Sequence, residues 1–302
     1  MVNKTLVITG ANGFIGSNLI LEAKKQKWDV KGIVRKKISA EYIRKLGAIP
    51  IIIDDLDEFA YLHTFEGCTA LVHLIGIIDG SVADFNKVHV EITRLVLKNA
   101  EVVGLNRVIT VSGLGVDQYG KAEWATNPYF GSKWKAEQLL HQISIPYVNF
   151  RPSYIFGPES YWFASLFERI KKERLNVIGD GLTPMQPVFV NDVVKSFLQA
   201  AAGFGPDDTT YDLVGPEVTN MLDIIRRITK YYNQIHHTNY KVKITKIPYR
   251  EAPKRLNISI EKASVSQCDL LGDTAPLVRE LGIKLTALNP AIKYTISNFT
   301  LV

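Results

Sequence analysis

The chain has 302 residues, of which 46% are hydrophobic and 22% charged, so it is long and apolar enough to bury a large core. Its net charge of +6 arises from 36 basic and 30 acidic residues. The basic residues are dispersed and their short clusters fall on expected helices, which argues against a nucleic-acid-binding protein.

Cysteines, histidines and apolar runs bear on the compartment and on metal binding. Cys68 and Cys268 lie far apart, so neither a disulfide framework nor a cysteine-based zinc site is expected. The six histidines lack the spacing of a metal site, and we expect no metal. The longest apolar run, residues 70–78, is too short to span a bilayer, and the first predicted strand leaves no room for a signal peptide. We therefore expect a soluble, cytoplasmic protein without a transmembrane segment.

The first predicted element is a strand that runs into a glycine-rich turn. Residues 6–9 form the strand, Gly10, Gly13 and Gly16 follow, and an amphipathic helical pattern begins at Phe14. These glycines let the backbone approach a ligand and let the helix pack closely on the strand. The free N–H groups and the helix dipole then favour a pyrophosphate over an empty glycine-rich turn.

A basic pair follows the second predicted strand, residues 29–34. In a dinucleotide-binding unit an acidic residue about 20 positions past the glycines holds the ribose 2′-hydroxyl. Here Arg35 and Lys36 occupy that place, and they would attract a 2′-phosphate. We therefore favour NADP(H) over NAD(H), with a solvated basic turn as the alternative interpretation.

Strands and helices alternate through the first two hundred residues. The sequence predicts further strands over residues 49–53, 70–75, 107–111, 146–151 and 211–214. It predicts helices over residues 39–46, 83–103, 161–172 and 191–202, the last capped by Asn191 or Asp192. Because the strands are continuously apolar, we expect an α/β fold with a Rossmann-type, doubly wound parallel sheet covered on both faces.

The pattern changes after residue 219, where a helix over 221–232 and a strand over 241–246 are expected. We interpret this part as a smaller C-terminal substrate lobe at the carboxyl edge of the sheet. The expected dinucleotide-binding domain comprises residues 1–156 and 186–215. The expected substrate lobe comprises residues 157–185 and 216–302.

Residues 127–137 contain the strongest candidates for catalytic side chains. Asn127 and Pro128 are a good N-cap and first helical residue, so Tyr129 and Lys133 are expected four apart on one helix face. The ammonium group and the helix N-terminus would favour the phenolate and lower the tyrosine pKa, which suits proton exchange with an alcohol or carbonyl. Ser112, after the fifth strand, could hydrogen-bond the same oxygen. The alternative is an aromatic ring packed on a lysine stem.

Four motifs in this order resemble the short-chain dehydrogenase/reductase superfamily, in its extended and atypical branches. Residues 9–16 match its Thr-Gly-x-x-Gly-x-x-Gly motif, and Tyr129 and Lys133 match its catalytic pair. Residues 151–158 and 187–193 are similar to later motifs of its epimerase/dehydratase-type members. The resemblance covers nearly the whole chain, most firmly residues 1–200.

The resemblance implies roles for individual residues. The pyrophosphate would be held by Gly10, Asn12, Gly13, Phe14, Ile15 and Gly16. The adenine and the nicotinamide side would be contacted by Asp55, Leu56, Leu74, Ile75, Gly76, Pro152 and Ser153. Tyr129 would exchange the proton, Lys133 would bind the ribose and lower the tyrosine pKa, and Ser112 would orient the substrate oxygen.

Two functions stay open at this point. The first is an NADP(H)-dependent oxidoreductase or epimerase/dehydratase acting on an alcohol or carbonyl, such as a sugar nucleotide. The second is a non-catalytic NADP(H)-binding accessory or redox-sensing subunit. It is motivated by the atypical residues 74–76 and 112–113. Residues 74–76, together with residues 186–188, are similar to those of the subgroup that includes the NADPH-binding accessory subunit of respiratory complex I. The resemblance implies either a homodimer, through helices starting near residues 84 and 128, or membership of a larger complex.

Overall fold

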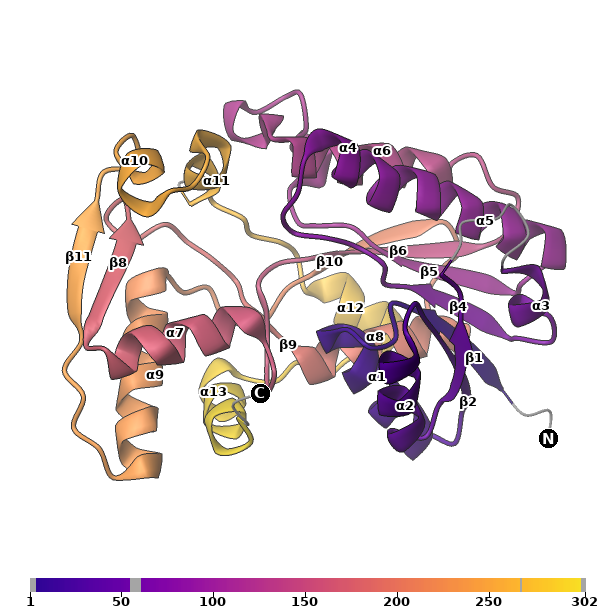
Figure 1. Cartoon of the computed structure of the whole chain (residues 1–302), viewed down its shortest axis with the longest axis horizontal. Helices are drawn as coiled ribbons and strands as arrows, with labels where there is room; N and C mark the ends of the chain where they lie inside the picture. Colours follow the sequence, from indigo (N-terminus) through magenta and orange to yellow (C-terminus); the bar gives the residue numbers. More distant parts are fainter. Residues whose placement is uncertain (1–3, 55–60, 267, 300–302) are drawn as a thin grey trace.

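The computed structural model describes residues 4–54, 61–266 and 268–299, and its centre is a seven-stranded sheet (Figure 1). The strand order is β10-β6-β5-β4-β1-β2-β3, and every neighbouring pair is parallel. The strands are β1 Thr5–Thr9, β2 Asp29–Val34, β3 Ile49–Ile52, β4 Ala70–His73, β5 Arg107–Val111, β6 Tyr147–Pro152 and β10 Thr209–Leu213. The expected Rossmann-type doubly wound sheet is confirmed, and its order reverses between β1 and β4.

Helices cover both faces of the sheet. On one face lie α1 (Phe14–Lys25), α2 (Lys37–Lys45) and α8 (Val190–Ala201); on the other lie α3 (Leu62–Phe65), α4 (Val82–Phe85), α5 (Ile92–Val103) and α6 (Pro128–Leu140) (Figure 1). Neighbouring residues of β1 show why the strands are apolar throughout. Leu6 and Ile8 belong to the core beneath α1 and α8, whereas Val7 belongs to the core beneath α5 and α6.

The predicted helix over 83–103 contains a turn that the sequence analysis did not foresee. Between α4 and α5 the residues Asn86–Glu91 form a π-helix, which inserts an extra residue into the helical path. Ser81 and Asp84 form a capping box at the start, and Gly104 ends the helix in a left-handed conformation with φ of 69°.

The expectation that Asn191 or Asp192 caps α8 is wrong. The helix begins at Val190, with Phe189 at the N-cap position. Asp192 is fully buried. Its carboxylate accepts one hydrogen bond from the backbone N–H of Thr286 at 2.7 Å and another from the Thr286 hydroxyl at 2.8 Å. The side chain therefore ties α8 to a distant segment of the chain, a tertiary role that local capping rules do not capture.

A group of elements beyond the carboxyl edge of the sheet is here called the outer lobe (Figure 1). It comprises α7 (Tyr161–Lys171), β8 (Arg174–Ile178), α9 (Met221–His236), β11 (Lys243–Ile247), α10 (Ala252–Leu256) and α11 (Ile260–Val265). β8 and β11 pair in parallel, and β7 (Ile155–Phe156) pairs with β9 (Val188–Phe189) where the chain leaves the main sheet. The last helices, α12 (Ala275–Leu281) and α13 (Leu288–Ser297), pack on α8 and α9 respectively.

No helix within the described ranges is long and apolar enough to cross a membrane.

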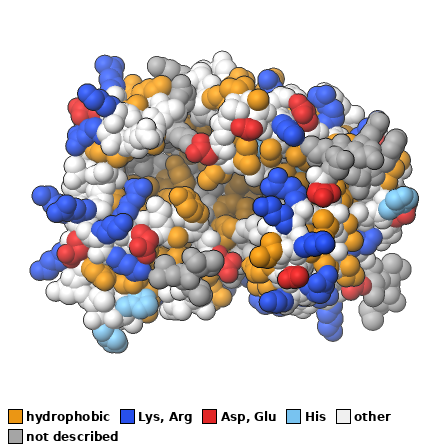
Figure 2. Space-filling view, in the orientation of Figure 1, with side chains coloured by type: hydrophobic (Ala, Val, Ile, Leu, Met, Phe, Trp, Pro, Cys, Tyr) orange, Lys and Arg blue, Asp and Glu red, His pale blue; other side chains and the backbone are white. Residues whose placement is uncertain are grey.

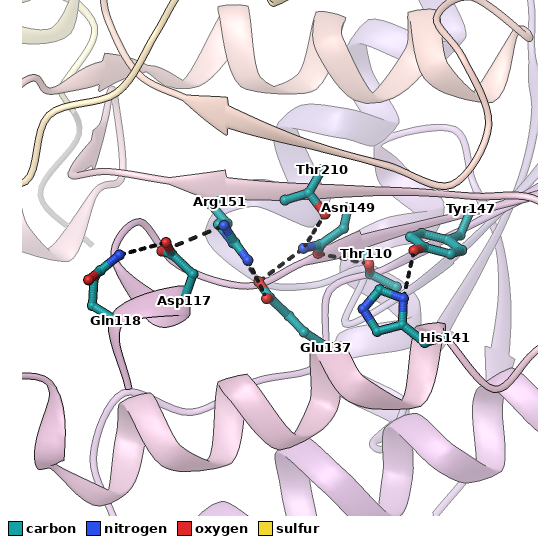
Figure 3. Close-up of polar contacts among 9 residues, drawn as sticks. All are labelled: Thr110, Asp117, Gln118, Glu137, His141, Tyr147, Asn149, Arg151 and Thr210. Atoms are coloured by element: carbon teal, nitrogen blue, oxygen red, sulfur yellow. Dashed lines mark hydrogen bonds and ion pairs between the residues drawn. The ribbon is translucent and has the colours of Figure 1, made fainter. Parts of the chain in front are cut away.

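A buried ion pair fixes α6 against β6 (Figure 3). The carboxylate of Glu137 accepts hydrogen bonds from Nε and Nη2 of Arg151 at 2.9 and 2.7 Å, and a third from Nδ2 of Asn149 at 3.0 Å. Asn149 Oδ1 accepts in turn from the Thr110 hydroxyl at 2.9 Å, so β5 joins the network. Asp117 lies 3.5 Å from Arg151 on the other side. The network sets the position of α6, the helix that carries Tyr129 and Lys133.

We expect Arg151→Met to lower the free energy of unfolding by about 3 kcal/mol, because it leaves the buried carboxylate of Glu137 without its charged partner. The double variant Arg151→Met/Glu137→Leu should lose less, since it removes both charges. Urea denaturation measures both, and Arg255→Met, which removes the exposed pair with Glu251, is a control expected to cost well under about 1 kcal/mol. An equal loss in the single and double variants would contradict the proposed role of the pair.

Candidate functional site

The turn between β1 and α1 approaches the end of β4 so closely that it needs glycine. Gly10 has φ of 65°, and a Cβ atom there would lie 3.0 Å from the carbonyl carbon and oxygen of Leu74. A Cβ atom on Gly16 would lie 2.5 Å from the carbonyl oxygen of Gly10. The turn therefore sits at the point where the strand order reverses, the usual place for a nucleotide on such a sheet.

The N-terminus of α1 is open to an anion. Its N-cap residue is Gly13, which has no side chain to satisfy the first N–H groups, and the first turn holds no acidic residue. Asn12 and Gly13 are exposed, while Phe14 and Ile15 are half-buried and pack on the core. This cradle fits a pyrophosphate, because the helix dipole and the free N–H groups both favour negative charge there.

Two further predicted cofactor contacts flank this turn. Arg35 and Lys36 follow β2 directly and are exposed, with Lys36 at the N-cap of α2. Leu74 and Ile75 are half-buried at the end of β4, and the backbone N–H of Leu74 donates to the Thr9 hydroxyl at 3.1 Å. The residues assigned to the adenine, Asp55 and Leu56, lie outside the described ranges.

Tyr129 lies in the first turn of α6, as predicted. The side chain of Asn127 caps the helix by accepting a hydrogen bond from the N–H of Phe130 at 2.9 Å. The rings of Phe85 and His89 meet the Tyr129 ring edge to face, with centroids 5.9 and 5.7 Å away. A Cβ atom placed on Gly113 would lie 3.9 Å from the Tyr129 hydroxyl, so that oxygen reaches the loop after β5.

Lys133 reaches the ends of two strands. Its Nζ donates a hydrogen bond to the carbonyl oxygen of Val111 at 3.0 Å, at the end of β5. A Cβ atom on Gly76, three residues beyond β4, would lie 3.5 Å from the same Nζ. The fold thus gathers Tyr129, Lys133 and Gly76 beside the loop that begins at Ser112.

Ser112 is buried and lacks a partner. The residue is 6% exposed, and its Oγ has no hydrogen-bond partner within the described parts of the chain. An orphaned buried hydroxyl costs about 1–3 kcal/mol and calls for an explanation. Ser112 lines a small cavity of about 20 Å³ together with Lys133, which has room for one water molecule or one ligand oxygen.

Pro152 and Ser153 continue the same edge at the end of β6. The Pro152 carbonyl accepts a hydrogen bond from the N–H of Leu114 at 2.9 Å, in the loop that holds Ser112. The N–H of Ser153 donates to the Leu213 carbonyl at 3.1 Å, and its hydroxyl donates to the Gln186 carbonyl. Pro152 therefore contacts the loop that holds Ser112, while the Ser153 hydroxyl is committed to the protein backbone.

Sequence reasoning missed two histidines, His73 and His89. His89 sits on the π-helix: its Nε2 accepts the N–H of Ile77 at 3.0 Å, so its proton is on Nδ1, which donates to Ser132 Oγ at 2.8 Å. The Ser132 hydroxyl then donates to the carbonyl oxygen of Tyr129 at 2.8 Å. His73, at the end of β4, lies 2.8 Å from the Thr9 hydroxyl. No local pattern marks these residues, because the π-turn and the strand pairing bring them here.

Burial governs the protonation of the site. Burial, and to a smaller extent the charge of Lys133, lowers the pKa of His73 and of His89 to about 3. Burial also lowers the pKa of Lys133 to about 8, against a smaller opposing effect of Glu137. The expectation of a lowered tyrosine pKa is wrong for this structure: burial raises the pKa of Tyr129 to about 12.

The comparisons with known proteins agree with this geometry. A sequence model of the NAD dependent epimerase/dehydratase family matches residues 6–213. The chain is 24% identical to a 4-hydroxy-2-methyl-3-oxo-4-farnesyl-3,4-dihydroquinoline-1-oxide ketoreductase of Stigmatella aurantiaca, over 86% of this chain and 81% of that protein. It is 27% identical to the mitochondrial NADH dehydrogenase [ubiquinone] 1 alpha subcomplex subunit 9 of Arabidopsis thaliana, over 74% of this chain and 58% of that protein.

The fold is also that of a solved UDP-glucose 4-epimerase from Thermotoga maritima. The two structures superimpose with a TM-score of 0.73 at 18% sequence identity, over 97% of this chain and 98% of that one.

The buried histidines predict a loss of stability in mild acid. Their pKa of about 3 in the folded protein is below the value near 6.5 expected when unfolded, so the unfolded state binds more protons between these values. The free energy of unfolding should therefore be highest above about pH 6.5 and fall toward pH 3 by about 1.4 kcal/mol per pH unit for each histidine.

Urea denaturation at pH 7 and pH 5 measures this fall. His89→Gln should remove about half of the difference between the two pH values, and the exposed His63→Gln should leave the difference as in the wild type. A wild-type protein equally stable at both pH values would contradict the burial of neutral histidines.

Proposed function

The chain belongs to the NAD dependent epimerase/dehydratase family, and we propose that it is an NADP(H)-dependent oxidoreductase that reduces a carbonyl with Tyr129 as the proton donor. One observation carries this proposal. The Tyr129 hydroxyl reaches the loop after β5 at Gly113, and Lys133 and the orphaned Ser112 hydroxyl line one small cavity where β4 and β5 end, beside the glycine-rich turn. Three groups able to bind one substrate oxygen and a dinucleotide cradle thus share one edge of the sheet.

The residues present fit NADP(H). The Gly10–Gly16 turn would hold the pyrophosphate, Gly76 and Lys133 would lie beside the nicotinamide ribose, and Arg35 with Lys36 would bind the 2′-phosphate. NAD(H) is the alternative cofactor, since the basic pair is the feature that favours the phosphorylated form. When bound, the nicotinamide supplies or accepts a hydride.

The protonation states of the side chains favour reduction. Tyr129, with a pKa of about 12, is protonated at neutral pH and can donate its proton to a carbonyl oxygen. Lys133, with a pKa of about 8, is mostly charged at pH 7 and would stabilise the phenolate left behind. Ser112 would donate a second hydrogen bond to the same carbonyl oxygen and so regain a partner for its buried hydroxyl.

A second candidate is a non-catalytic NADP(H)-binding accessory subunit of a larger complex. The similarity to the NADH dehydrogenase subunit of Arabidopsis thaliana favours it, as do the apolar residues Leu74 and Ile75 at the end of β4. A sugar-nucleotide epimerase or dehydratase is the third possibility within the family. NADPH consumption on a panel of ketones and aldehydes separates the first candidate from the second.

Tyr129→Phe should lower kcat for carbonyl reduction by about a hundredfold or more, because it removes the proton donor. NADPH affinity should stay within about twofold, as the ring and its packing on Phe85 and His89 are retained. Tyr161→Phe, at a tyrosine that is 80% exposed, is the matched control and should keep wild-type activity. Wild-type turnover by Tyr129→Phe would refute the assigned role.

Arg35→Asp should weaken NADPH binding at least about tenfold and leave NADH binding nearly unchanged, because a carboxylate repels the 2′-phosphate that the guanidinium attracts. Fluorescence titration of both cofactors measures the preference. Lys45→Asp, an equal charge reversal at the exposed far end of α2, is the control and should alter neither affinity by more than about twofold. An unchanged preference in Arg35→Asp would count against the NADP(H) assignment.

A further inference from the structure

The outer lobe contains a cavity of about 360 Å³. It lies between α7, β8 and the segment from α10 to residue 268. Figure 2 shows this face of the molecule hollowed between the outer lobe and the sheet, with hydrophobic side chains in the hollow. The volume is in the range of about 300–1,000 Å³ that is usual for small-molecule sites.

The walls of the cavity are mainly apolar. Side chains from five elements and from the loops between them supply this surface, among them Trp162, Leu175, Val177, Met185, Met221 and Leu256. Thioether side chains adapt to ligands of varied shape, and two of these residues are methionines. Arg169 is the single charged residue among the described residues that line the cavity, and it is exposed.

This lining disfavours a nucleoside diphosphate. A diphosphate carries at least two negative charges, and burying them needs several cationic or N–H donors around the phosphates. The described lining offers the Arg169 guanidinium and a few hydroxyl and amide groups, such as Ser165 and Asn176. An aliphatic chain needs no such compensation, and its affinity grows with the apolar area that it buries.

The cavity adjoins the Tyr129 site. Tyr154, which lines the cavity, comes two residues after Pro152, whose carbonyl is bonded to the N–H of Leu114. On the other side of the cavity, Cys268 contributes to the lining. Two residues later, Leu270 lies close to Gly115, since a Cβ atom placed on Gly115 would be 2.8 Å from the Leu270 side chain. The chain segments that form the cavity walls therefore contact the loop that carries Ser112 and Gly113.

We propose that this cavity binds the apolar chain of the substrate, and that the substrate class is a carbonyl compound with a long aliphatic chain, of acyl or prenyl type. This inference rests on the proposed function, because it places the carbonyl at Tyr129 and the chain in the outer lobe. In the reduction of a ketone to an alcohol, the Tyr129 hydroxyl would give its proton to the carbonyl oxygen, and bound NADPH would supply the hydride for the carbonyl carbon and be oxidised to NADP⁺.

The test measures binding of a homologous series of methyl ketones, from butan-2-one to tridecan-2-one, by calorimetry to the full chain loaded with NADP⁺, which cannot reduce them. Affinity should rise about fourfold for each added methylene until the cavity is filled. Ser165→Trp, on the helical wall, should remove this dependence on chain length, whereas Ser165→Ala should keep it. NADPH affinity should be equal in all three proteins.

An affinity that does not vary with chain length would overturn the proposal, as would competition between UDP-glucose and tridecan-2-one for the same site.

Tyr129→Phe separates this inference from the proposed function. If the long ketones bind in wild type and in Tyr129→Phe with the same dependence on chain length, but neither protein consumes NADPH, then the proposed function fails and the cavity assignment stands. If wild type consumes NADPH with short and long ketones at equal kcat/KM, the cavity assignment fails and the proposed function stands.

Discussion

The burial of one polar row on α6 is the constraint on which the site depends. Tyr129, Lys133 and Glu137 recur at intervals of four, so they share one face of the helix, and that face packs on the ends of the central strands. Glu137 is held by Arg151 at the inner end of the row, which fixes the helix against β6. Burial weakens the charged form of Lys133 and keeps Tyr129 protonated, so the same packing that builds the site also determines which proton it can give.

The dinucleotide cradle, the proposed catalytic side chains and the cavity of the outer lobe follow one another from the carboxyl edge of the sheet outward. The close contact of Gly10 with the end of β4 defines the dinucleotide cradle, and Lys133 spans from there to the end of β5. The loop with Ser112 follows, and the apolar cavity of the outer lobe lies beyond Tyr154. The cofactor cradle and the proposed proton donor therefore lie along one edge of the sheet, and Tyr154 connects this edge to the proposed chain-binding cavity. The topology dictates this order, because the carboxyl ends of parallel strands share an edge.

Patterns of neighbouring residues in the sequence were sufficient to predict the elements whose structure depends on those neighbours. Continuous apolar runs identified the seven strands of the sheet, Asn127 and Pro128 marked the start of α6, and the glycine spacing identified the turn after β1. Features that depend on distant contacts were not foreseen. The π-turn that presents His89, the use of Asp192 to bind Thr286, and the raised pKa of Tyr129 all arise from packing between segments far apart in the chain. The sequence does not show how far a side chain is removed from water. The helix dipole and Lys133 therefore suggested a lowered pKa for Tyr129, whereas burial raises it.

The most direct test of the central claim is the ionisation of Tyr129 itself. The phenolate absorbance of the wild type minus that of Tyr129→Phe, followed as the pH is raised, isolates this one hydroxyl among the 13 tyrosines. With its pKa at about 12, we expect no phenolate from Tyr129 below about pH 10. A Tyr129 phenolate that forms between about pH 7 and pH 8 would contradict this expectation, because the protein would then hold a proton acceptor where a proton donor is proposed.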